Sequence, residues 1–552
     1  MAATDSVKGR GGRYARAVAS RRGFSRYLPL SGVRSGVMVV VALITLLGLA
    51  LRVYQLLRPG LLTGVLEYDD GVYFGSAVRL VHGVIPYRDF VLIQPPGITL
   101  LLSPVALASR AVGTDTGFAI SRVLSACAGA ASVWLCGLLV RHRGRAAVII
   151  ACGLVAIHPD SVGAAQSVLL EPWLVVFTLL GLCAAFSQGE LVDSDRRLMW
   201  AGVALACAVA VKVWAIVPAA VLVVFVLAMR GRRAAISYVV GLVGGVAVTI
   251  GAFFVLAPRA FFEDVVISQL SRVDDSRTSM LFRLTSLFGF TDVTLAKQSV
   301  IVLAIVVVSG SAIALFAGWG LGVKPPRALD LLACVCLILT LAMFLWPVDY
   351  YDHYAAFFSP FLALVLAGAV GSLLSGLRAE LLQTSTGPLA LRAPPALSLA
   401  LCVGLIIAAA IVRSHLAELG GLPAPTAQAR QIPRGACVLT DFPAYTLTTN
   451  RFTSDEVNCP AMVDALGTDY ALSHGKNGVT GAGRSAALVS VWLTALRHAQ
   501  YVWLKCHPPG APNCEDLTNR WIPWTSPAIL RYFTANFRPA IAGPYVSYIV
   551  LS

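Results

Sequence analysis

Long apolar runs alternate with short basic clusters along most of this chain. The first run covers about residues 37–51 and follows an N-terminal segment rich in arginine. About ten further runs, each close to the length that crosses the hydrocarbon core of a bilayer, lie before residue 413. The pattern predicts about eleven membrane-spanning helices. A cleaved signal peptide is the competing interpretation of the first run, but no small-residue cleavage site clearly follows it.

The basic clusters follow alternate predicted spans, so they all fall on one side of the membrane. Cytoplasmic loops carry an excess of Lys and Arg, which places these clusters and the N-terminus inside. The C-terminus then lies outside. In chain order, the clusters are residues 141–145, 195–197, 230–233, 324–327 and Arg378.

The apolar segment at residues 95–112 does not fit this alternation. As a full span it would reverse the sidedness of every later loop, so we expect a helix that lies in the outer interface or dips into it. Residues 67–94 then face outward together with this helix.

Composition supports the same class of protein. The chain has 552 residues, of which 57% are hydrophobic and only 13% charged, and its mean hydropathy is +0.76. These values exclude an ordinary soluble protein and predict a multi-pass protein of the plasma membrane. The net charge of +15 could suggest nucleic acid as a partner. The basic residues, however, lie in short loops that face anionic lipid, so we expect membrane lipid and not nucleic acid.

The chain changes character after about residue 413, where Pro, Thr, Asn and charged residues mix with short apolar runs. This segment predicts a small folded α/β domain. The predicted organisation is therefore a basic cytoplasmic segment at residues 1–35, a transmembrane domain at 36–412, and an extracytoplasmic domain at 413–552.

Four of the twelve cysteines lie in this last segment, at Cys437, Cys459, Cys506 and Cys514. An outer domain is exposed to oxidising conditions, in which disulfides form and persist. We predict the pairs Cys437–Cys459 and Cys506–Cys514, although the two other connectivities stay open because spacing alone does not select among them. The remaining cysteines are isolated within apolar runs and are expected to be packing residues.

Acidic residues gather directly after the first span, at Glu67-Tyr68-Asp69-Asp70. An ionised side chain at membrane depth costs roughly 2.5–3.5 kcal/mol, so clustered acids beside a span indicate a wet functional site. The alternative is a solvated acidic loop. The predicted topology sends further polar and aromatic residues to the same outer side: Tyr73, Arg88, Asp89, Gln94, His158, Asp160, Gln166, Glu171, Lys212, Trp214, Arg272, Asp274, Asp275, Arg277, Arg283, Asp349, Tyr351, Asp352, His353 and Tyr354. Acids and bases together suit an anionic substrate.

Single residues of this set also have structural interpretations. Lys212 can extend from a helix end to the interface. Glu171, which precedes Pro172, can stabilise a helix N-terminus through the helix dipole. Asp352 and His353 can form a surface pair. The combination carries more weight than any single member.

Five short motifs follow one another on the predicted outer side. They are Asp69-Asp70-Gly71-Val72-Tyr73, residues 83–89 leading to Gln94-Pro95-Pro96-Gly97, Leu170-Glu171-Pro172, Lys212 with Pro218, and His353-Tyr354 with Pro360. In this order they resemble the GT-C class of membrane glycosyltransferases, in particular the protein O-mannosyltransferase and aminoarabinose transferase superfamily and its actinobacterial relatives. The resemblance covers about residues 36–374. Gln94 is a departure, because the family often has His or Lys before the prolines.

The resemblance implies a polytopic helical GT-C fold and an inverting transfer of mannose or arabinofuranose from a polyprenyl-phosphate donor. The acceptor would be a cell-envelope glycan, lipid or protein on the outer face of the membrane. Asp69 is the expected general base, with Asp70 as the second candidate. The donor phosphate is expected to contact Lys212, Arg272 and His353. Residues expected in the sugar and acceptor pocket are Tyr73, Arg88, Gln94, Glu171 and Tyr354. Whether a divalent metal takes part is left open, with Asp69, Asp70 and Glu171 as its candidate ligands.

Two other functional classes stay open at this stage. A transporter or flippase of lipid-linked sugar would also carry ionisable residues near the membrane, but it should show internal hydropathy repeats, and the chain shows none. A non-catalytic envelope scaffold would have no need for Asp69, Glu171 and Lys212 together. Cytoplasmic loops such as residues 140–146 are too short to build a nucleotide-sugar domain, which favours a lipid-linked donor.

Overall fold

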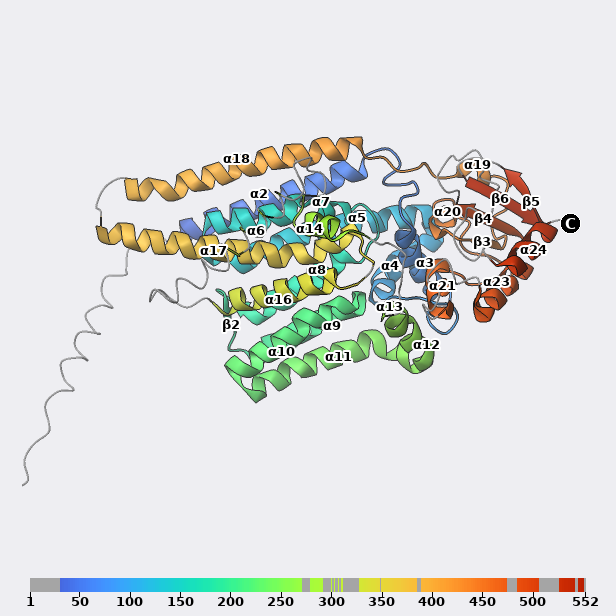
Figure 1. Cartoon of the computed structure of the whole chain (residues 1–552), viewed down its shortest axis with the longest axis horizontal. Coiled ribbons are helices and arrows are strands. Elements are labelled where there is room, and N and C mark those ends of the chain that lie inside the picture. Colours follow the sequence, from blue (N-terminus) through green and yellow to red (C-terminus); the bar gives the residue numbers. More distant parts are fainter. Residues whose placement is uncertain are drawn as a thin grey trace, which may run out of the picture.

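A computed structural model describes residues 30–270, 278–290, 327–347, 349–384, 389–473, 484–505, 526–541 and 545–550, together with residues 299, 302, 306, 309 and 310. Long helices form a bundle, and a smaller α/β domain sits at one end of it (Figure 1). Seven of the described helices are long and apolar enough to cross a membrane, and three shorter ones are apolar. The protein is therefore a polytopic membrane protein.

The bundle is built from helices that the apolar runs predict. In chain order they are α2 (Leu30–Leu56), α5 (Thr114–Val140), α6 (Arg145–Ile157), α8 (Glu171–Ala185), α9 (Asp195–Val211), α10 (Ile216–Arg230), α11 (Arg232–Leu256), α16 (Ala328–Leu345), α17 (Ala355–Thr384) and α18 (Leu389–Glu418). The predicted span at about residues 300–320 lies almost entirely outside the described residues, so the total of eleven stays a prediction. Helix α18 continues past residue 413, where the outer domain was expected to begin.

Short elements connect the long helices. They are η2 (Arg141–Arg143), α7 (Pro159–Gly163), β1 (Phe186–Ser187), β2 (Glu190–Leu191), η3 (Val213–Ala215), α12 (Pro258–Phe262), η4 (Glu263–Ile267), α13 (Ser268–Leu270), α14 (Met280–Leu287) and η5 (Asp352–Tyr354). Of these, β1 and β2 form an antiparallel hairpin between α8 and α9.

Basic loops gather at the end of the bundle far from the α/β domain. Arg143, which follows α5, donates to both carboxylate oxygens of Asp330 at the start of α16, at 2.6 and 2.5 Å, and to the Gly368 carbonyl of α17 at 3.1 Å. Arg327 donates to the carbonyl of Gln188 in the β1–β2 hairpin. These contacts bring together loops from distant parts of the sequence, and we call this region the basic end.

The opposite end carries two helices of the first long loop, α3 (Tyr68–Val81) and α4 (Gly97–Val112), and the α/β domain (Figure 1). The domain packs closely on α3, because a Cβ at Gly71 would lie 2.6 Å from the Ala444 backbone nitrogen. Tyr68 Oη donates to Asp464 Oδ1 at 2.8 Å and accepts from the Leu466 amide at 2.8 Å. The acidic first loop is therefore enclosed between the bundle and the domain.

The α/β domain contains a four-stranded sheet in the order β3-β4-β6-β5. Strand β3 (Val438–Thr440) is parallel to β4 (Tyr501–Lys505), with Val438 opposite Tyr501. Strand β6 (Tyr545–Val550) is antiparallel to both β4 and β5 (Phe537–Ile541). The helices of this domain are α19 (Thr426–Ala429), α20 (Pro443–Leu447), α21 (Ala465–Ser473), α23 (Ala486–His498) and α24 (Pro527–Asn536). Trp492, Val502 and Phe533 form part of its core, all less than 2% exposed.

The predicted disulfide Cys437–Cys459 is confirmed, and its Cα atoms are 5.4 Å apart. The other predicted pair, Cys506–Cys514, lies outside the described residues. The free cysteines that the structure describes lie in the bundle helices, as expected for packing residues.

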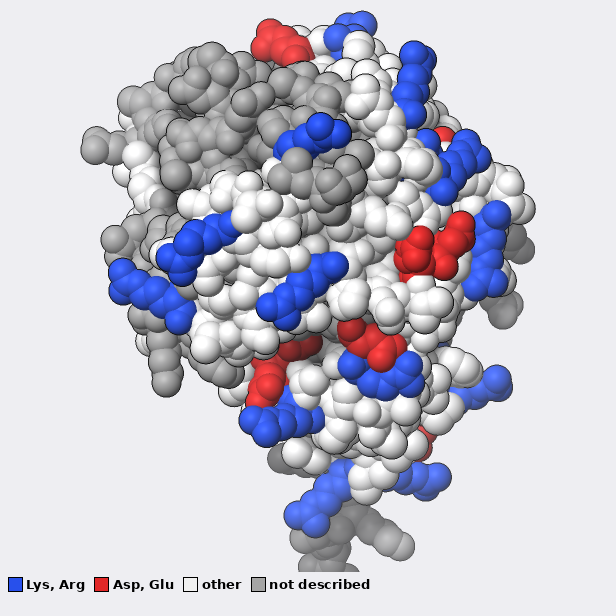
Figure 2. Space-filling model, turned by 90° about the vertical axis from the view of Figure 1, so that its right-hand side faces the viewer, with Lys and Arg blue, Asp and Glu red and all other residues white. Residues whose placement is uncertain are grey.

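The face of the molecule at the α/β domain carries charges of both signs. Figure 2 shows Lys and Arg side chains scattered among uncharged residues, several of them next to Asp or Glu. Within the described part of this face there is no continuous basic surface of the kind that binds nucleic acid.

Candidate active site

Asp69 and Asp70 lie in the first turn of α3, after Glu67, which has an extended backbone (φ −122°, ψ 164°). Successive residues of an α-helix point about 100° apart, so the two carboxylates face different surroundings. Asp70 turns into the bundle and is fully buried. Asp69 is half-buried, and its Oδ2 accepts a hydrogen bond from Tyr73 Oη at 3.2 Å, one helical turn later.

Asp70 forms an ion pair with Arg122 of α5, whose side chain is also fully buried. Arg122 Nη2 lies 2.7 Å from Asp70 Oδ2. The Nη1 atom donates to the carbonyls of Leu61, Leu62 and Gly64 at 2.8–3.0 Å. The pair therefore fixes the loop before α3 against the bundle. The Asp70 carboxylate has a structural role in this contact, because it is paired with Arg122.

Glu171 and Lys212 meet at the ends of two neighbouring helices. Glu171 begins α8, where the helix dipole favours a carboxylate, and Lys212 follows the last residue of α9. Because α8 and α9 pack side by side, Lys212 Nζ lies 2.6 Å from Glu171 Oε1, and both side chains are at least 94% buried. The second oxygen, Glu171 Oε2, is buried with no hydrogen-bond partner among the described residues.

Aromatic rings and a histidine surround this ion pair. Lys212 Nζ lies 3.5 Å from the ring centroid of Trp214 and 4.7 Å from that of Tyr354. The Trp214 and Tyr354 rings pack edge to face, with their centroids 4.4 Å apart. His353 Nε2 is 3.9 Å from Glu171 Oε1. Elements η3 and η5 thus place a cation within an aromatic enclosure.

Tyr73 is buried beside Asp69, and its hydroxyl donates to Asp69 Oδ2. Burial raises the pKa of this hydroxyl, and the charges of Asp69 and Glu171 raise this pKa further. Gln166 Nε2 donates to Glu67 Oε1 at 3.3 Å. Burial and the charges of Asp70, Asp69 and Asp352 raise the pKa of Glu67 to about 8. We call this set the polar cluster: Glu67, Asp69, Tyr73, Glu171, Lys212, His353 and Tyr354.

Three residues predicted for the site lie elsewhere or outside the described chain. Arg88 is exposed and forms a surface ion pair with Asp89 at 2.8 Å, so it does not join the polar cluster. Gln94 is 7% exposed, and its backbone carbonyl accepts from Tyr87 Oη at 2.6 Å. Arg272 lies outside the described residues.

The candidate metal ligands do not converge. Asp70 faces Arg122, and Glu171 faces Lys212, whereas Asp69 bonds to Tyr73. Within the part of the chain that the structure describes, no three His, Cys, Asp or Glu side chains are placed to hold a metal ion.

Sequence reasoning missed Arg122, although a signal was present. An arginine inside the apolar run at residues 119–140 is costly unless it finds a partner, and such residues mark structural or functional contacts. Arg52 of α2 is a second example, since it is fully buried and donates to the carbonyls of Gly48 and Ala156 at 3.0 and 3.3 Å.

Residues 109–250 match the family model described as dolichyl-phosphate-mannose-protein mannosyltransferase. The structure is similar to the crystal structure of ArnT from Cupriavidus metallidurans bound to undecaprenyl phosphate, with 12% identity and a TM-score of 0.57 over 94% of this chain and 98% of that chain. The fold is that of the GT-C membrane glycosyltransferases. A second similar structure is that of the archaeal oligosaccharyltransferase AglB from Archaeoglobus fulgidus, in complex with an inhibitory peptide and a dolichol-phosphate. It has 12% identity and a TM-score of 0.51 over 85% of this chain and 69% of that chain. No curated protein sequence matches the chain.

The family match and the polar cluster overlap in the sequence. Residues 109–250 include Arg122, Glu171 and Lys212, which are the buried charges that tie α5, α8 and α9 to the site. The similarity of the GT-C fold extends over the α/β domain as well, because the alignment with ArnT covers nearly the whole chain.

Proposed function

We propose that this protein transfers a sugar from a polyprenyl-phosphate donor to a cell-envelope acceptor, with Asp69 as the general base. The observation that carries this proposal is the difference between two neighbouring carboxylates. Asp70 is buried and forms an ion pair with Arg122. Asp69 is half-buried, and its carboxylate accepts a hydrogen bond from the Tyr73 hydroxyl. The GT-C fold, shared with an ArnT structure bound to undecaprenyl phosphate, supports the class of donor.

In the proposed reaction, the acceptor hydroxyl attacks the anomeric carbon of the donor sugar from the face opposite the phosphate. Its proton passes to Asp69 as the new glycosidic bond forms. The bond from the anomeric carbon to the phosphate oxygen breaks, and the polyprenyl phosphate leaves with the electron pair. A positioned carboxylate base contributes roughly 10²–10⁴-fold to such a step.

Lys212 is proposed to stabilise the charge on the departing phosphate, with His353 beside it. A cation fixed in a buried site before the reaction is effective, since it needs no reorganisation as charge develops. Glu171 Oε1 holds Lys212 in place at 2.6 Å, while Trp214 and Tyr354 exclude water from the ammonium group. Glu171 Oε2, which has no partner among the described residues, is an acceptor for a sugar hydroxyl. Arg272 stays a sequence prediction for the same phosphate.

The reaction is proposed to occur on the outer face of the plasma membrane. Basic loops gather at the end of the bundle far from the polar cluster, and such loops are retained in the cytoplasm. This orientation puts the N-terminus inside and the polar cluster and α/β domain outside. The Cys437–Cys459 disulfide is consistent with an oxidising compartment for that domain.

The test uses purified full-length protein and synthetic polyprenyl-phosphate mannose and polyprenyl-phosphate arabinose, each carrying a radiolabelled sugar. We expect the wild type to transfer labelled sugar from one of the two donors to envelope acceptors. The transfer rate of Asp69→Asn should be at least about 100-fold lower than that of the wild type. Asp89→Asn is the matched control, because Asp89 belongs to the same loop but pairs with Arg88 at the surface. The control should keep the wild-type rate.

The same labelled donors, added to vesicles that contain the purified protein, separate the competing classes of function. A transporter would move labelled lipid across the vesicle membrane without forming a glycosidic bond to an acceptor. Full transfer by Asp69→Asn would remove Asp69 from the mechanism while keeping the enzyme. No transfer from either donor, with lipid movement observed, would overturn the proposed function.

A further inference from the structure

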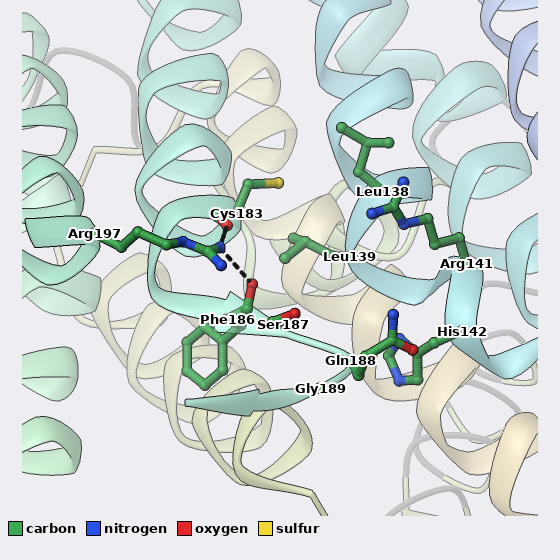
Figure 3. A pocket seen from close by; sticks show the side chains of 10 residues that line it. All are labelled: Leu138, Leu139, Arg141, His142, Cys183, Phe186, Ser187, Gln188, Gly189 and Arg197. Carbon is green, nitrogen blue, oxygen red and sulfur yellow. Dashed lines mark hydrogen bonds between the residues drawn. The ribbon is translucent and has the colours of Figure 1, made fainter. Parts of the chain in front are cut away.

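A cavity of about 170 Å³ lies at the basic end of the bundle (Figure 3). It is lined by η2, by the C-terminal ends of α5 and α8, by the β1–β2 hairpin and by the first turn of α9. Its lining residues are Leu138, Leu139, Arg141, His142, Cys183, Phe186, Ser187, Gln188, Gly189 and Arg197. Glu171 of the polar cluster is the first residue of α8, and the cavity adjoins the last residues of the same helix. At a rise of 1.5 Å per residue, the cavity is about 20 Å from Glu171.

Two arginines extend toward one another from opposite sides of the cavity (Figure 3). Arg197 donates through Nη2 to the carbonyls of Cys183 and Phe186, at 2.9 and 3.2 Å. These bonds orient its guanidinium but do not neutralise it. The Arg141 side chain is exposed and has no hydrogen bond or ion pair with any residue that the structure describes. Among the described residues that line the cavity there is no Asp or Glu.

His142 also lines the cavity and contributes a polar atom without a hydrogen-bond partner among the described residues. Its Nε2 is buried and has no hydrogen-bond partner within the described chain. The hairpin turn holds it in place, since a Cβ at Gly189 would lie 3.0 Å from this nitrogen. A buried polar atom without a partner is costly, and a bound ligand would satisfy it.

The charges around the cavity leave an excess of positive potential. Arg143 is neutralised by Asp330. Arg327 lies directly behind the hairpin, with its Cδ 2.6 Å from the position of a Cβ at Gly189. The charge of Glu190 also acts on Arg327, but this carboxylate is exposed, where water and salt screen it. No Asp or Glu among the described lining residues pairs with the two arginines of the cavity, and such a space favours an anion.

We propose that this cavity binds a phosphate anion, and that its position at the end of the spans assigns it to the headgroup of an anionic membrane lipid. Arginine forms two parallel hydrogen bonds to phosphate oxygens, and the exposed Arg141 and Arg197 can be reached from the bilayer interface. The volume fits one phosphate group with a few waters of about 30 Å³ each, but not a nucleotide sugar, since sites for such ligands occupy about 300–1,000 Å³.

The test is native mass spectrometry of the purified full-length protein with phosphatidylglycerol or phosphatidylcholine added. We expect preferential retention of phosphatidylglycerol by the wild type. The variant R141Q/R197Q should lower its affinity at least about tenfold, since removal of a single charge-assisted hydrogen bond weakens binding by roughly that factor. The variant R141Q alone should give part of this decrease without affecting folding, because the Arg141 side chain makes no bond to the described protein.

The matched control is R196Q/R232Q, which removes the same charge from exposed arginines that do not line the cavity. An equal decrease of phosphatidylglycerol binding in this control, or equal retention of both lipids by the wild type, would overturn the proposal. Inorganic phosphate is then added as a competitor. Lipid that resists millimolar phosphate supports the headgroup as the ligand, whereas complete displacement would overturn the lipid assignment in favour of soluble phosphate.

Discussion

The buried pair Asp70–Arg122 gives the sharpest prediction, because it separates a structural carboxylate from a catalytic one. The perturbation is Asp70→Asn, which removes the negative charge and keeps the shape of the side chain. Arg122 is then left buried, and among the described residues its charge is compensated by the carbonyls of Leu61, Leu62 and Gly64 and by the Phe118 ring, whose centroid lies 4.2 Å from Cζ.

The magnitude follows from the burial of both partners, which have no exposed side-chain area. Removal of one partner from a buried ion pair costs about 3–5 kcal/mol, because an uncompensated charge stays in the interior. The three carbonyl bonds put the expected cost at the lower limit, about 3 kcal/mol. By contrast, Asp69→Asn weakens one hydrogen bond within the described chain, the bond from Tyr73, and should cost about 1 kcal/mol or less.

The assay is equilibrium unfolding of the purified variants in mixed micelles, combined with the sugar-transfer assay on the same samples. We expect Asp70→Asn to lose stability and Asp69→Asn to lose activity. In a double-mutant cycle, Arg122→Met combined with Asp70→Asn should recover part of the stability, with a coupling of at least about 2 kcal/mol. Wild-type stability of Asp70→Asn together with abolished transfer would refute this reasoning and make Asp70 the base.

Three further predictions concern the polar cluster and its neighbours. Lys212→Met should lower both the stability of the fold and the affinity for the donor. The double variant Lys212→Met/Glu171→Gln should regain stability but not donor binding. Unfolding measures the stability, and the KM for donor reports donor binding. Burial raises the pKa of Glu67 from 4.5 to about 8, so its protonated form stabilises the fold below pH 4.5 and this stability is lost as the pH rises to 8. Glu67→Gln should therefore unfold with a flatter pH dependence between pH 5 and 8, and an unchanged slope would contradict the assignment. Tyr68→Phe removes the hydrogen bonds to Asp464 and the Leu466 amide, which should lower the free energy of unfolding by about 1–2 kcal/mol. Hydrogen exchange in α21 should become faster. Unchanged exchange would mean that this contact does not hold the domain on α3.

Particular residues show how far the sequence could predict the site. Asp69, Tyr73, Glu171, Lys212, His353 and Tyr354 were all chosen from motif order and sidedness. The structure places Tyr73 against Asp69, and it places Lys212 and His353 against Glu171 with Tyr354 beside Lys212. Arg88 was chosen by the same reasoning but lies at the surface, because its neighbour Asp89 satisfies it locally. Motif position alone does not reveal which of two adjacent polar residues turns inward.

The pairing of charges could not be read from the sequence. Arg122 lies 52 positions from Asp70, and Lys212 lies 41 positions from Glu171. Each contact depends on which helices pack together and on how each helix is rotated. The link between Tyr68 and Asp464 spans 396 positions and depends on the docking of a separate domain.

The sequence by itself determined the membrane class, the apolar helices and the alternation of basic loops, whereas the pairing of Cys437 with Cys459 was decided by the structure. These features follow from local rules, because lipid requires long apolar helices whose backbone groups are satisfied internally. The tertiary structure alone decided that Asp70 is structural, that Lys212 is held by Glu171, and that a basic cavity forms beside the β1–β2 hairpin. Those outcomes depend on side-chain contacts between distant segments, which form only when the bundle and the α/β domain pack together.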